Sequence, residues 1–395
     1  AIKGQKIFIS TGDHDFGGNI VHLVLARLPD APEGVKGISL FLVPKFLVQA
    51  DGALGARNGM SVGSLEEKMG IHAQPTCVMN YDDATGWLVG EPNRGLAAMF
   101  TMMNAERLMV GIQGLGIAGA AYGQAVGYAK ERLQGRSADG TRNPVPIIEH
   151  ADVRRMLLNV RSFVEAGRAL AGWVALQMDR AHHHADAAER AKADALVALL
   201  TPVVKAGFTD FGFESAVQAQ QVFGGHGYIR EWGMEQYVRD ARIAQIYEGT
   251  NGVQAMDLAG RKLSLAGGAV VDGFFDMVAS ELTEAGKAEG VRLIAARTGE
   301  ALELLRQTTA SLKGADVDSL GAAAVDYLRM FALVSFGWIW VRMAQAAAGG
   351  ETPLHAAKRD MARYFATRML PQVQGLASQI AAGPEPVLAL EVDMF

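Results

Sequence analysis

The chain of 395 residues is long enough for two or three domains of about 150 residues each and for a large core. Its composition is that of a folded globular protein, because 20% of the residues are charged and 50% are hydrophobic. The formal net charge of −5 lacks the basic excess of non-specific nucleic-acid binders, and the single cysteine, Cys77, excludes an intramolecular disulfide and a cysteine-rich zinc site. We therefore expect a protein of a reducing, cytoplasmic compartment that does not bind nucleic acid.

Residues 1–95 have the pattern of a β domain. Short β-branched and aromatic runs such as KIFIS and GISLFLV alternate with Gly, Pro, Asn and Asp, which are typical of turns. A strand-like pattern starts at Ile2, almost directly at the first residue of the sequence. We therefore expect that a further part of the protein precedes this chain.

After residue 95 the pattern becomes helical, with apolar residues at three- and four-residue spacing. Four long helices are predicted at 96–134, 151–185, 187–223 and 235–262, and they indicate a four-helix bundle domain at 96–264. Residues 265–395 form a C-terminal extension, with candidate helices at 270–288, 291–312, 317–347 and 354–381. The predicted fold class is thus α+β, mostly α, with a sandwich-like or barrel-like β domain before the helices.

The longest conspicuous apolar run near the end of the sequence is Met330–Val341. Arg329 and Arg342 close it well short of the roughly 18 to 20 residues that a membrane-spanning helix needs. We therefore expect no membrane span.

Three motifs suggest chemistry but have plainer interpretations. Gly114, Gly116 and Gly119 match the GxGxxG dinucleotide fingerprint, yet the residues before them have helical spacing, whereas the fingerprint requires a strand and a turn. Close packing between helices is the better interpretation. The three histidines at 182–184 point in different directions on a helix, which favours a solvated helix end over a metal site. Cys77 has no identifiable base beside it and is interpreted as a packed residue.

The most informative stretch is residues 221–254, QVFGGHGYIREWGMEQYVRDARIAQIYEGTNGVQ. Its glycine cluster allows the backbone to approach another group closely, and a lone carboxylate, Glu248, lies between Tyr247 and Gly249. From the residues alone, Glu248 is open to two interpretations, a functional group or a helix cap.

This stretch resembles the acyl-CoA dehydrogenase signature, in which a Gln, a GG-x-G-[YF] turn and an RDA-[KR]-I segment lead to an IYEGT motif. The resemblance covers residues 1–262 in the family's order. GISLFLVPK and EEKMGI resemble the central β domain, and ERLMVGIQGLGIA resembles the first bundle helix. The region after 265 resembles the extension of the long-form members, a group that includes 3-methylmercaptopropionyl-CoA dehydrogenases. The family's N-terminal helical domain is absent from this sequence.

The resemblance implies an FAD-dependent acyl-CoA dehydrogenase. Members oxidise an acyl-CoA thioester to the trans-2-enoyl-CoA, in which a Glu removes the α-proton and the β-hydrogen leaves as hydride to flavin N5. Glu248, in an intact YEGT context, matches the catalytic base. Glu106 stands where the isovaleryl and long-chain branches hold their base, so it is the alternative base, although it could form ordinary helix-surface pairs.

The resemblance also assigns binding residues. Phe8 and Ser10 would lie beside the flavin, and Arg132 would lie at the FAD pyrophosphate. Three residues would contact the adenosine half of a neighbouring subunit's FAD: Gln221, Gly224 and Gly225. Thr250 and Asn251 would lie beside the flavin and its phosphates. Arg107, Tyr247 and Gly249 would lie at the substrate site. In YAKERLQGR the aromatic residue that usually precedes the glycine is absent, which leaves the FAD contact around Gln134 open.

Cofactor contacts across a subunit boundary imply a homodimer at least, with a tetramer as the larger possibility. An electron-transfer flavoprotein would accept the electrons, as in the β-oxidation of fatty acids. Two alternatives stay open on the same scaffold: an acyl-CoA oxidase that uses O₂, and a non-catalytic flavin-binding or scaffold protein. The charge of −5 and the intact YEGT motif argue against the scaffold.

Overall fold

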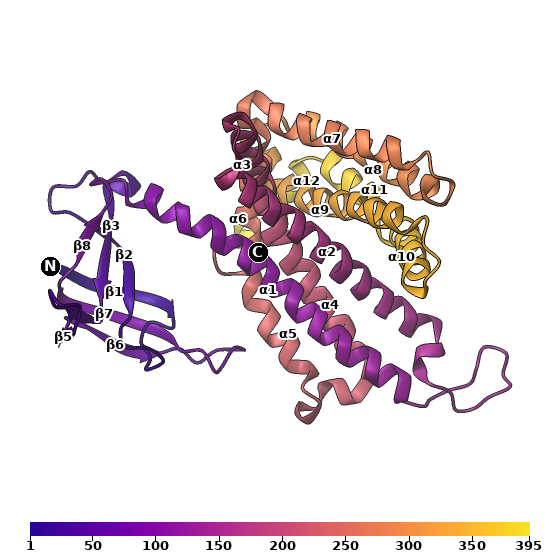
Figure 1. Ribbon diagram of the computed structural model, residues 1–395, viewed down its shortest axis with the longest axis horizontal. Coiled ribbons are helices and arrows are strands. Elements are labelled where there is room, and N and C mark those ends of the chain that lie inside the picture. The colour runs from indigo at the N-terminus through magenta and orange to yellow at the C-terminus, as the bar shows by residue number, and fades with distance from the viewer. The chain divides into compact units, whose positions relative to one another are not determined.

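The computed structural model describes residues 1–395, which form two compact units, Ala1–Glu106 and Arg107–Phe395 (Figure 1). Unit 1 is built mainly from β-strands and unit 2 from helices. The predicted class, α+β and mostly α, is confirmed.

Unit 1 holds short antiparallel sheets. Its strands are β1 (Ile2–Ser10), β2 (Val21–Arg27), β3 (Ile38–Pro44), β4 (Phe46–Val48), β5 (Leu54–Arg57), β6 (Met60–Leu65), β7 (Thr76–Ala84) and β8 (Trp87–Val89). They pair in the orders β1-β7-β6, β2-β3-β8 and β4-β5. Buried residues of the two three-stranded sheets, among them Val24, Val43 and Met79, share one core. Cys77 is fully buried there, which confirms its interpretation as a packed residue.

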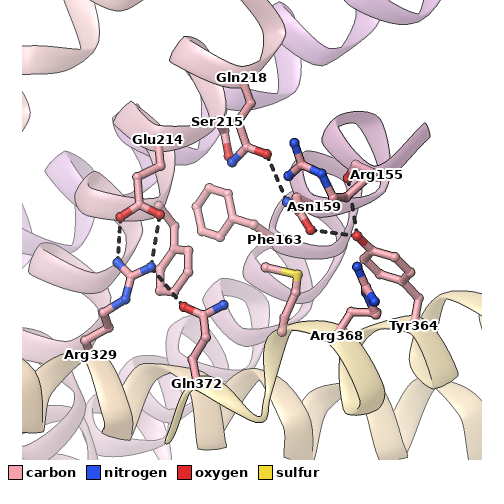
Figure 2. A pocket seen from close by; sticks show the side chains of 12 residues that line it. Arg155, Asn159, Phe163, Glu214, Ser215, Gln218, Arg329, Tyr364, Arg368 and Gln372 are labelled. Carbon is pink, nitrogen blue, oxygen red and sulfur yellow. Dashed lines mark hydrogen bonds and ion pairs between the residues drawn. The ribbon is translucent and has the colours of Figure 1, made fainter. Parts of the chain in front are cut away.

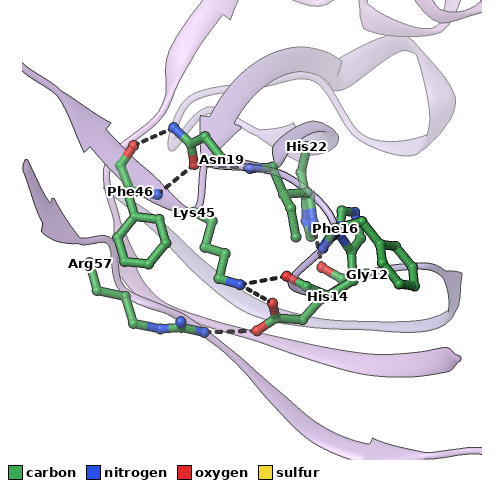
Figure 3. Close-up of polar contacts among 10 residues, drawn as sticks. Gly12, His14, Phe16, Asn19, His22, Lys45, Phe46 and Arg57 are labelled. Atoms are coloured by element: carbon green, nitrogen blue, oxygen red, sulfur yellow. Dashed lines mark hydrogen bonds and ion pairs between the residues drawn. The ribbon is translucent and has the colours of Figure 1, made fainter. Parts of the chain in front are cut away.

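Polar contacts fix the loop that follows β1 (Figure 3). The His22 Nε2 atom lies 2.8 Å from the Gly12 carbonyl oxygen, and Lys45 Nζ both donates to the backbone of this loop and pairs with Asp13. Arg57 pairs with the same carboxylate at 2.9 Å. Although burial raises the pKa of Asp13, the hydrogen bonds from Lys45 and Arg57 hold it below its usual range. The loop is therefore anchored from two directions.

Unit 2 contains the bundle helices and the extension. The bundle consists of α1 (Gly95–Glu131, which begins in unit 1), α2 (Ala151–His183), α3 (Ala187–Pro202), α4 (Phe208–Val222), α5 (Met234–Arg242) and α6 (Asn251–Met256). The extension consists of α7 (Ala269–Ala285), α8 (Glu289–Leu312), α9 (Val317–Ala347), α10 (Pro353–Tyr364), α11 (Gln372–Ala381) and α12 (Glu385–Leu388). Short π or 3₁₀ turns join them, including η3 (Val203–Gly207), η4 (Gly224–Tyr228), η6 (Ile243–Gln245) and η9 (Phe365–Met369). Figure 1 shows the orange and yellow helices gathered around α9.

The glycines of the false dinucleotide motif lie inside α1, where Gly114 packs against α4, Gly119 faces α2, and Gly116 has open space beside it. A Cβ atom on Gly114 would lie 2.9 Å from the Phe208 carbonyl oxygen, and a Cβ on Gly212 would lie 2.6 Å from the Gly114 carbonyl oxygen. Any side chain would push the two helices apart. The prediction of close helix packing is thereby confirmed at Gly114, and a Cβ on Gly119 would lie 3.0 Å from the Arg168 side chain of α2, whereas nothing lies within 4 Å of a Cβ on Gly116.

Two predicted helices are broken in the structure. The helix predicted at 235–262 is wrong, because the chain leaves helical geometry between η6 and α6, where Glu248 and Gly249 have φ angles of +54° and +86°. The helix predicted at 354–381 divides into α10, η9 and α11 around Pro371, which has no backbone N–H to donate and therefore disfavours a continuous helix.

Helix α9 is the centre of the extension. The side chains of Trp338, Trp340 and Phe331 are fully buried, and the helix contacts α2, α8, α10 and α11. Three helical runs are long and apolar enough to cross a membrane: Ala187–Val222, Asn251–Ala285 and Val317–Ala347. In the first and third, 78% of the apolar window is buried within the fold, so core packing accounts for much of their hydropathy, whereas the second is 33% buried. The absence of a membrane span stays a prediction.

Candidate functional site

The segment around Glu248 has a strained backbone. A φ of +54° is unfavourable for a residue with a Cβ atom, by about 1–2 kcal/mol, and such strain collects at functional sites. The Glu248 side chain is half-buried. Before it, the Tyr247 hydroxyl donates to Gln113 Oε1 of α1. After it, Gly249 has φ +86° and a Cβ there would lie 2.6 Å from Gln254 Nε2, so glycine is required. The fold thus holds a carboxylate on a strained turn, beside a position whose positive φ favours glycine.

The turn is tied to the buried side of α4 through the first residues of α6. Thr250 caps α6, because its Oγ1 accepts the backbone N–H of Val253 at 3.3 Å. Asn251 uses both ends of its amide, since Oδ1 accepts from Lys205 Nζ at 2.9 Å and Nδ2 donates to Asp210 Oδ1 at 2.7 Å. We call Lys205, Asp210 and Asn251 the anchor triad. The Asn251 side chain is thus engaged inside the protein, and its contact with a cofactor stays a prediction.

The anchor triad brings buried charged groups into the electrostatic neighbourhood of Glu248. Lys205 is fully buried in η3, and desolvation lowers the pKa of its ammonium group to about 8, against the opposing effect of Asp210 and Glu248. Burial also raises the pKa of Asp210, although hydrogen bonds from Gln245 and Asn251 counteract it. Glu248 is therefore within electrostatic range of a buried cation.

Arg107 belongs to the same region. It is half-buried on α1, and its positive charge contributes to lowering the pKa values of both Lys205 and Lys262, after the larger effect of desolvation. Close by, Gln254 is 1% exposed and its Oε1 atom accepts no hydrogen bond within the chain. An unsatisfied buried acceptor beside Gly249 fits a site that is completed by another molecule.

A second group of predicted residues lies where α1 and α4 end. The Tyr128 ring stacks on Phe223 with centroids 4.1 Å apart, and its hydroxyl lies 2.9 Å from His226 Nδ1, which holds the end of α1 against η4. Exposed residues follow on both helices: Arg132, Gln221, Gly224 and Gly225. A Cβ on either glycine would meet nothing within 4 Å, so the backbone there is open to a large ligand or a second subunit.

The sequence departure near Gln134 is accommodated by a backbone bridge. The Gln134 N–H donates to the Val145 carbonyl at 2.9 Å, and its carbonyl oxygen lies 2.7 Å from His150 Nε2. The chain after Arg132 is thereby closed into a short antiparallel pairing.

In unit 1, Phe8 stands on a bulge of β1. The register shifts between Lys6 and Ile9, Phe8 has φ +58°, and its ring is 68% exposed. An exposed aromatic ring with a left-handed backbone on a bulge is costly without a binding role. Ser10 is exposed at the end of the same strand, and Glu106, the alternative base, is exposed on α1 as the last residue of unit 1.

The sequence analysis missed Lys205, Asp210 and Gln113. The available signal for Lys205 was a lone cation within the apolar helical run LLTPVVKAGF, where a lysine on a buried face needs a partner. Its partner Asn251 is distant in sequence, and the pairing follows only from the fold.

Comparison with known proteins gives consistent matches. A family model described as "Acyl-CoA dehydrogenase, C-terminal domain" matches residues 93–263, and one described as "Acetyl-CoA dehydrogenase C-terminal like" matches 274–391. The 3-methylmercaptopropionyl-CoA dehydrogenase of Ruegeria pomeroyi is 44% identical over 96% of this chain and 66% of that protein. The broad-specificity linear acyl-CoA dehydrogenase FadE5 of Mycobacterium tuberculosis is 33% identical over 100% of this chain and 69% of that protein.

Among solved structures, ACDH-11 of Caenorhabditis elegans, in complex with C11-CoA, matches with a TM-score of 0.78 at 19% identity. The match covers 99% of this chain and 63% of that one. This likeness shows a shared fold across both units' sequences. The chain spans about two thirds of the length of these three relatives.

Proposed function

Since this chain belongs to the acyl-CoA dehydrogenase family, we propose that it forms the catalytic part of an enzyme that oxidises an acyl-CoA thioester to the trans-2-enoyl-CoA. The observation that carries the proposal is Glu248, a half-buried carboxylate on a strained turn that leads into α6, where the anchor triad holds the side chain of Asn251. A general base must be held in one position to remove a weakly acidic α-proton efficiently.

Each residue of the turn has a part in this proposal. Glu248 takes the α-proton, and its backbone N–H donates to the thioester oxygen as negative charge develops there. Tyr247 and Gly249 line the acyl slot, and the hydrogen bond from Tyr247 to Gln113 fixes the tyrosine ring. Arg107 contributes to the substrate region from α1. Glu106 is kept as the alternative base.

The residues present fit FAD as the cofactor. When bound, FAD would accept the β-hydrogen of the substrate as hydride. The exposed Phe8 ring offers an aromatic face to a flavin, and the Ser10 hydroxyl a hydrogen-bond donor. Arg132 carries the forked cation that suits a pyrophosphate, and the open backbone at Gly224 and Gly225 leaves room for an adenosine half. Gln221 and Thr250 are assigned to the same cofactor.

The remaining assignments follow from this mechanism. FAD contacts shared across a subunit boundary require a homodimer or tetramer. An electron-transfer flavoprotein is the proposed electron acceptor, and β-oxidation in the cytoplasm is the proposed context. The apolar helices are interpreted as core helices and not as membrane spans, because most of the apolar surface of α3–α4 and α9 is buried in the fold.

The experiment uses the purified full-length protein with its flavin bound. The visible absorbance of the flavin is recorded under anaerobic conditions with acyl-CoAs of different chain lengths, including a 3-methylmercaptopropionyl-CoA. The proposal predicts bleaching of the visible flavin absorbance with at least one acyl-CoA. A flavoprotein that no acyl-CoA bleaches would contradict it, and peroxide formation under air at the rate of bleaching would identify the oxidase alternative instead.

A further inference from the structure

A cavity of about 250 Å³ lies within unit 2, where α2 and α4 of the bundle face α9, η9 and α11 of the extension (Figure 2). Its floor is apolar, since Phe163 and Phe211 are almost fully buried there. Its walls are polar. Asn159 Nδ2 donates to Gln218 Oε1 at 3.0 Å, and the Tyr364 hydroxyl donates to Asn159 Oδ1 at 2.8 Å. These side chains are already paired, so the wall is rigid.

The charges at this cavity are unbalanced. Arg329 is neutralised by Glu214 through two hydrogen bonds of 2.6 and 3.1 Å, and its guanidinium stands 4.5 Å from the Phe211 ring centroid. Arg368 has no carboxylate within ion-pair distance, and Arg155 pairs with Asp152, a surface residue that does not line the cavity. Glu214 is the only acidic residue of the lining.

A second cavity of about 570 Å³ shares part of the wall of the first. Both cavities are lined by Arg155, Tyr364 and Arg368. The second cavity, but not the first, is also lined by Arg154 and Arg363. The only acidic residue that lines the second cavity is Asp360, and neither Arg154 nor Arg363 forms an ion pair. Five arginines therefore face two carboxylates, in a chain whose net charge is −5.

The arginines that carry no balancing carboxylate are exposed, so the surplus positive charge stands at a solvent-accessible rim of the two cavities. Arg154 and Arg155 come from α2, whereas Arg363 and Arg368 come from α10 and η9 of the extension, so two distant segments bring like charges to one place. Like charges that line the same cavities repel one another to the extent that solvent does not screen them. A bound anion would reduce that repulsion.

We propose that the two cavities form one binding site for a small organic phosphate, with Arg155 and Arg368 at the phosphate and the apolar floor under the organic part. Guanidinium groups bind phosphate through parallel N–H donors, and the combined volume is that of ordinary small-molecule sites. The proposal is independent of the dehydrogenase assignment, because none of these residues belongs to the Glu248 region.

The test is calorimetric titration of the full-length, FAD-loaded protein with ADP, pyrophosphate, inorganic phosphate and adenosine. ADP is expected to bind more tightly than pyrophosphate or phosphate, and adenosine is expected not to bind. Arg368→Gln and Arg155→Gln should each weaken ADP binding by about ten-fold or more, as expected for a charge-assisted pair. Arg292→Gln, an exposed and unpaired arginine that lines a separate cavity, is the matched control and should leave the affinity unchanged.

Three results would overturn the proposal. The first is that neither ADP nor pyrophosphate binds at millimolar concentration. The second is that ADP binds to Arg368→Gln and Arg155→Gln as tightly as to the wild type, which would place its site elsewhere. The third is that adenosine binds as tightly as ADP, which would show that the arginines make no contact with phosphate that contributes to binding. Thermal unfolding of each variant checks that it folds, and Arg363→Gln, at an exposed arginine that lines the second cavity, is a further variant if Arg368→Gln fails to fold.

Discussion

The Glu248 segment and helix α9 are both partly or fully buried in unit 2, but the sequence uses them differently. Helix α9 is a continuous helix of 31 residues whose buried side chains are almost all apolar. The Glu248 segment contains two consecutive residues with positive φ angles and leads into Asn251, which accepts a hydrogen bond from a fully buried lysine. Apolar packing stabilises a fold, whereas strain and buried charge reduce stability and persist where a chemical group must be held in place. The contrast separates residues that build the molecule from residues that serve its chemistry.

The largest effect is expected from Trp338→Ala in α9. The Trp338 ring is fully buried, packs edge-on against Trp173 at 5.1 Å, and its Nε1 donates to Glu281 at 2.7 Å. The cavity left behind should lower the free energy of unfolding by about 3–5 kcal/mol. Urea denaturation followed by circular dichroism measures this. Leu293→Ala, whose side chain is 51% exposed, should cost less than about 1 kcal/mol. Equal losses for the two variants would contradict α9 as the core.

The next effect concerns pH and the buried lysine. The folded-state pKa of Lys205 of about 8 lies below its ordinary value of 10.5, so the unfolded chain binds more protons between these values. The contribution of Lys205 to the free energy of unfolding therefore rises as the pH rises from about 8 to 10.5. Relative to Lys205→Met, the wild type should gain about 2–3 kcal/mol between pH 7 and pH 10. Urea denaturation at both pH values tests this, with Lys287→Met, 69% exposed, as the flat control. Parallel pH profiles for wild type and Lys205→Met would contradict a desolvated lysine.

A smaller change in stability is expected from Gly249→Ala, together with a large change in activity. An alanine at φ +86° is strained, and its Cβ would collide with Gln254, at a cost of about 1–2 kcal/mol. Displacement of the turn should slow flavin bleaching by about 10²-fold. Gly252→Ala is the matched control, because it lies in α6 and its Cβ would have only one neighbour, at 4.0 Å. Similar bleaching rates for both variants would show that the turn geometry is not needed.

The smallest effect is expected at the surface of the extension. Arg306 and Asp276 form an ion pair of 2.7 Å, but the Asp276 side chain is 74% exposed. Asp276→Asn should change the free energy of unfolding by less than about 1 kcal/mol, and added salt should remove even this difference. A larger loss in urea denaturation would mean that charge pairs, and not apolar contacts, hold α7 to α8.

The same contrast explains what the sequence could predict. The bounds of α9 agree with the prediction at 317–347, because a long apolar pattern with a cap at Asp316 is a strong local signal. The break before α6 was missed although Gly249, Thr250, Asn251 and Gly252 are poor helix formers and Thr250 caps α6, because the apolar spacing on both sides of them continues. The base candidate itself came from the family's YEGT motif and not from residue physics. The anchor triad could not be predicted, because Lys205 and Asn251 become neighbours only in the folded chain.

The most direct test of the central claim is the anaerobic rate of flavin bleaching in Glu248→Gln, compared with Glu106→Gln, with the acyl-CoA that bleaches the wild type fastest. Both substitutions keep side-chain size and remove a carboxylate, and the flavin absorbance of each variant reports whether the cofactor is bound. If Glu248 is the base, its variant binds flavin but bleaches at least about 10²-fold more slowly, while Glu106→Gln stays close to the wild type. Full bleaching by Glu248→Gln, with loss in Glu106→Gln, would contradict the assignment and make Glu106 the base.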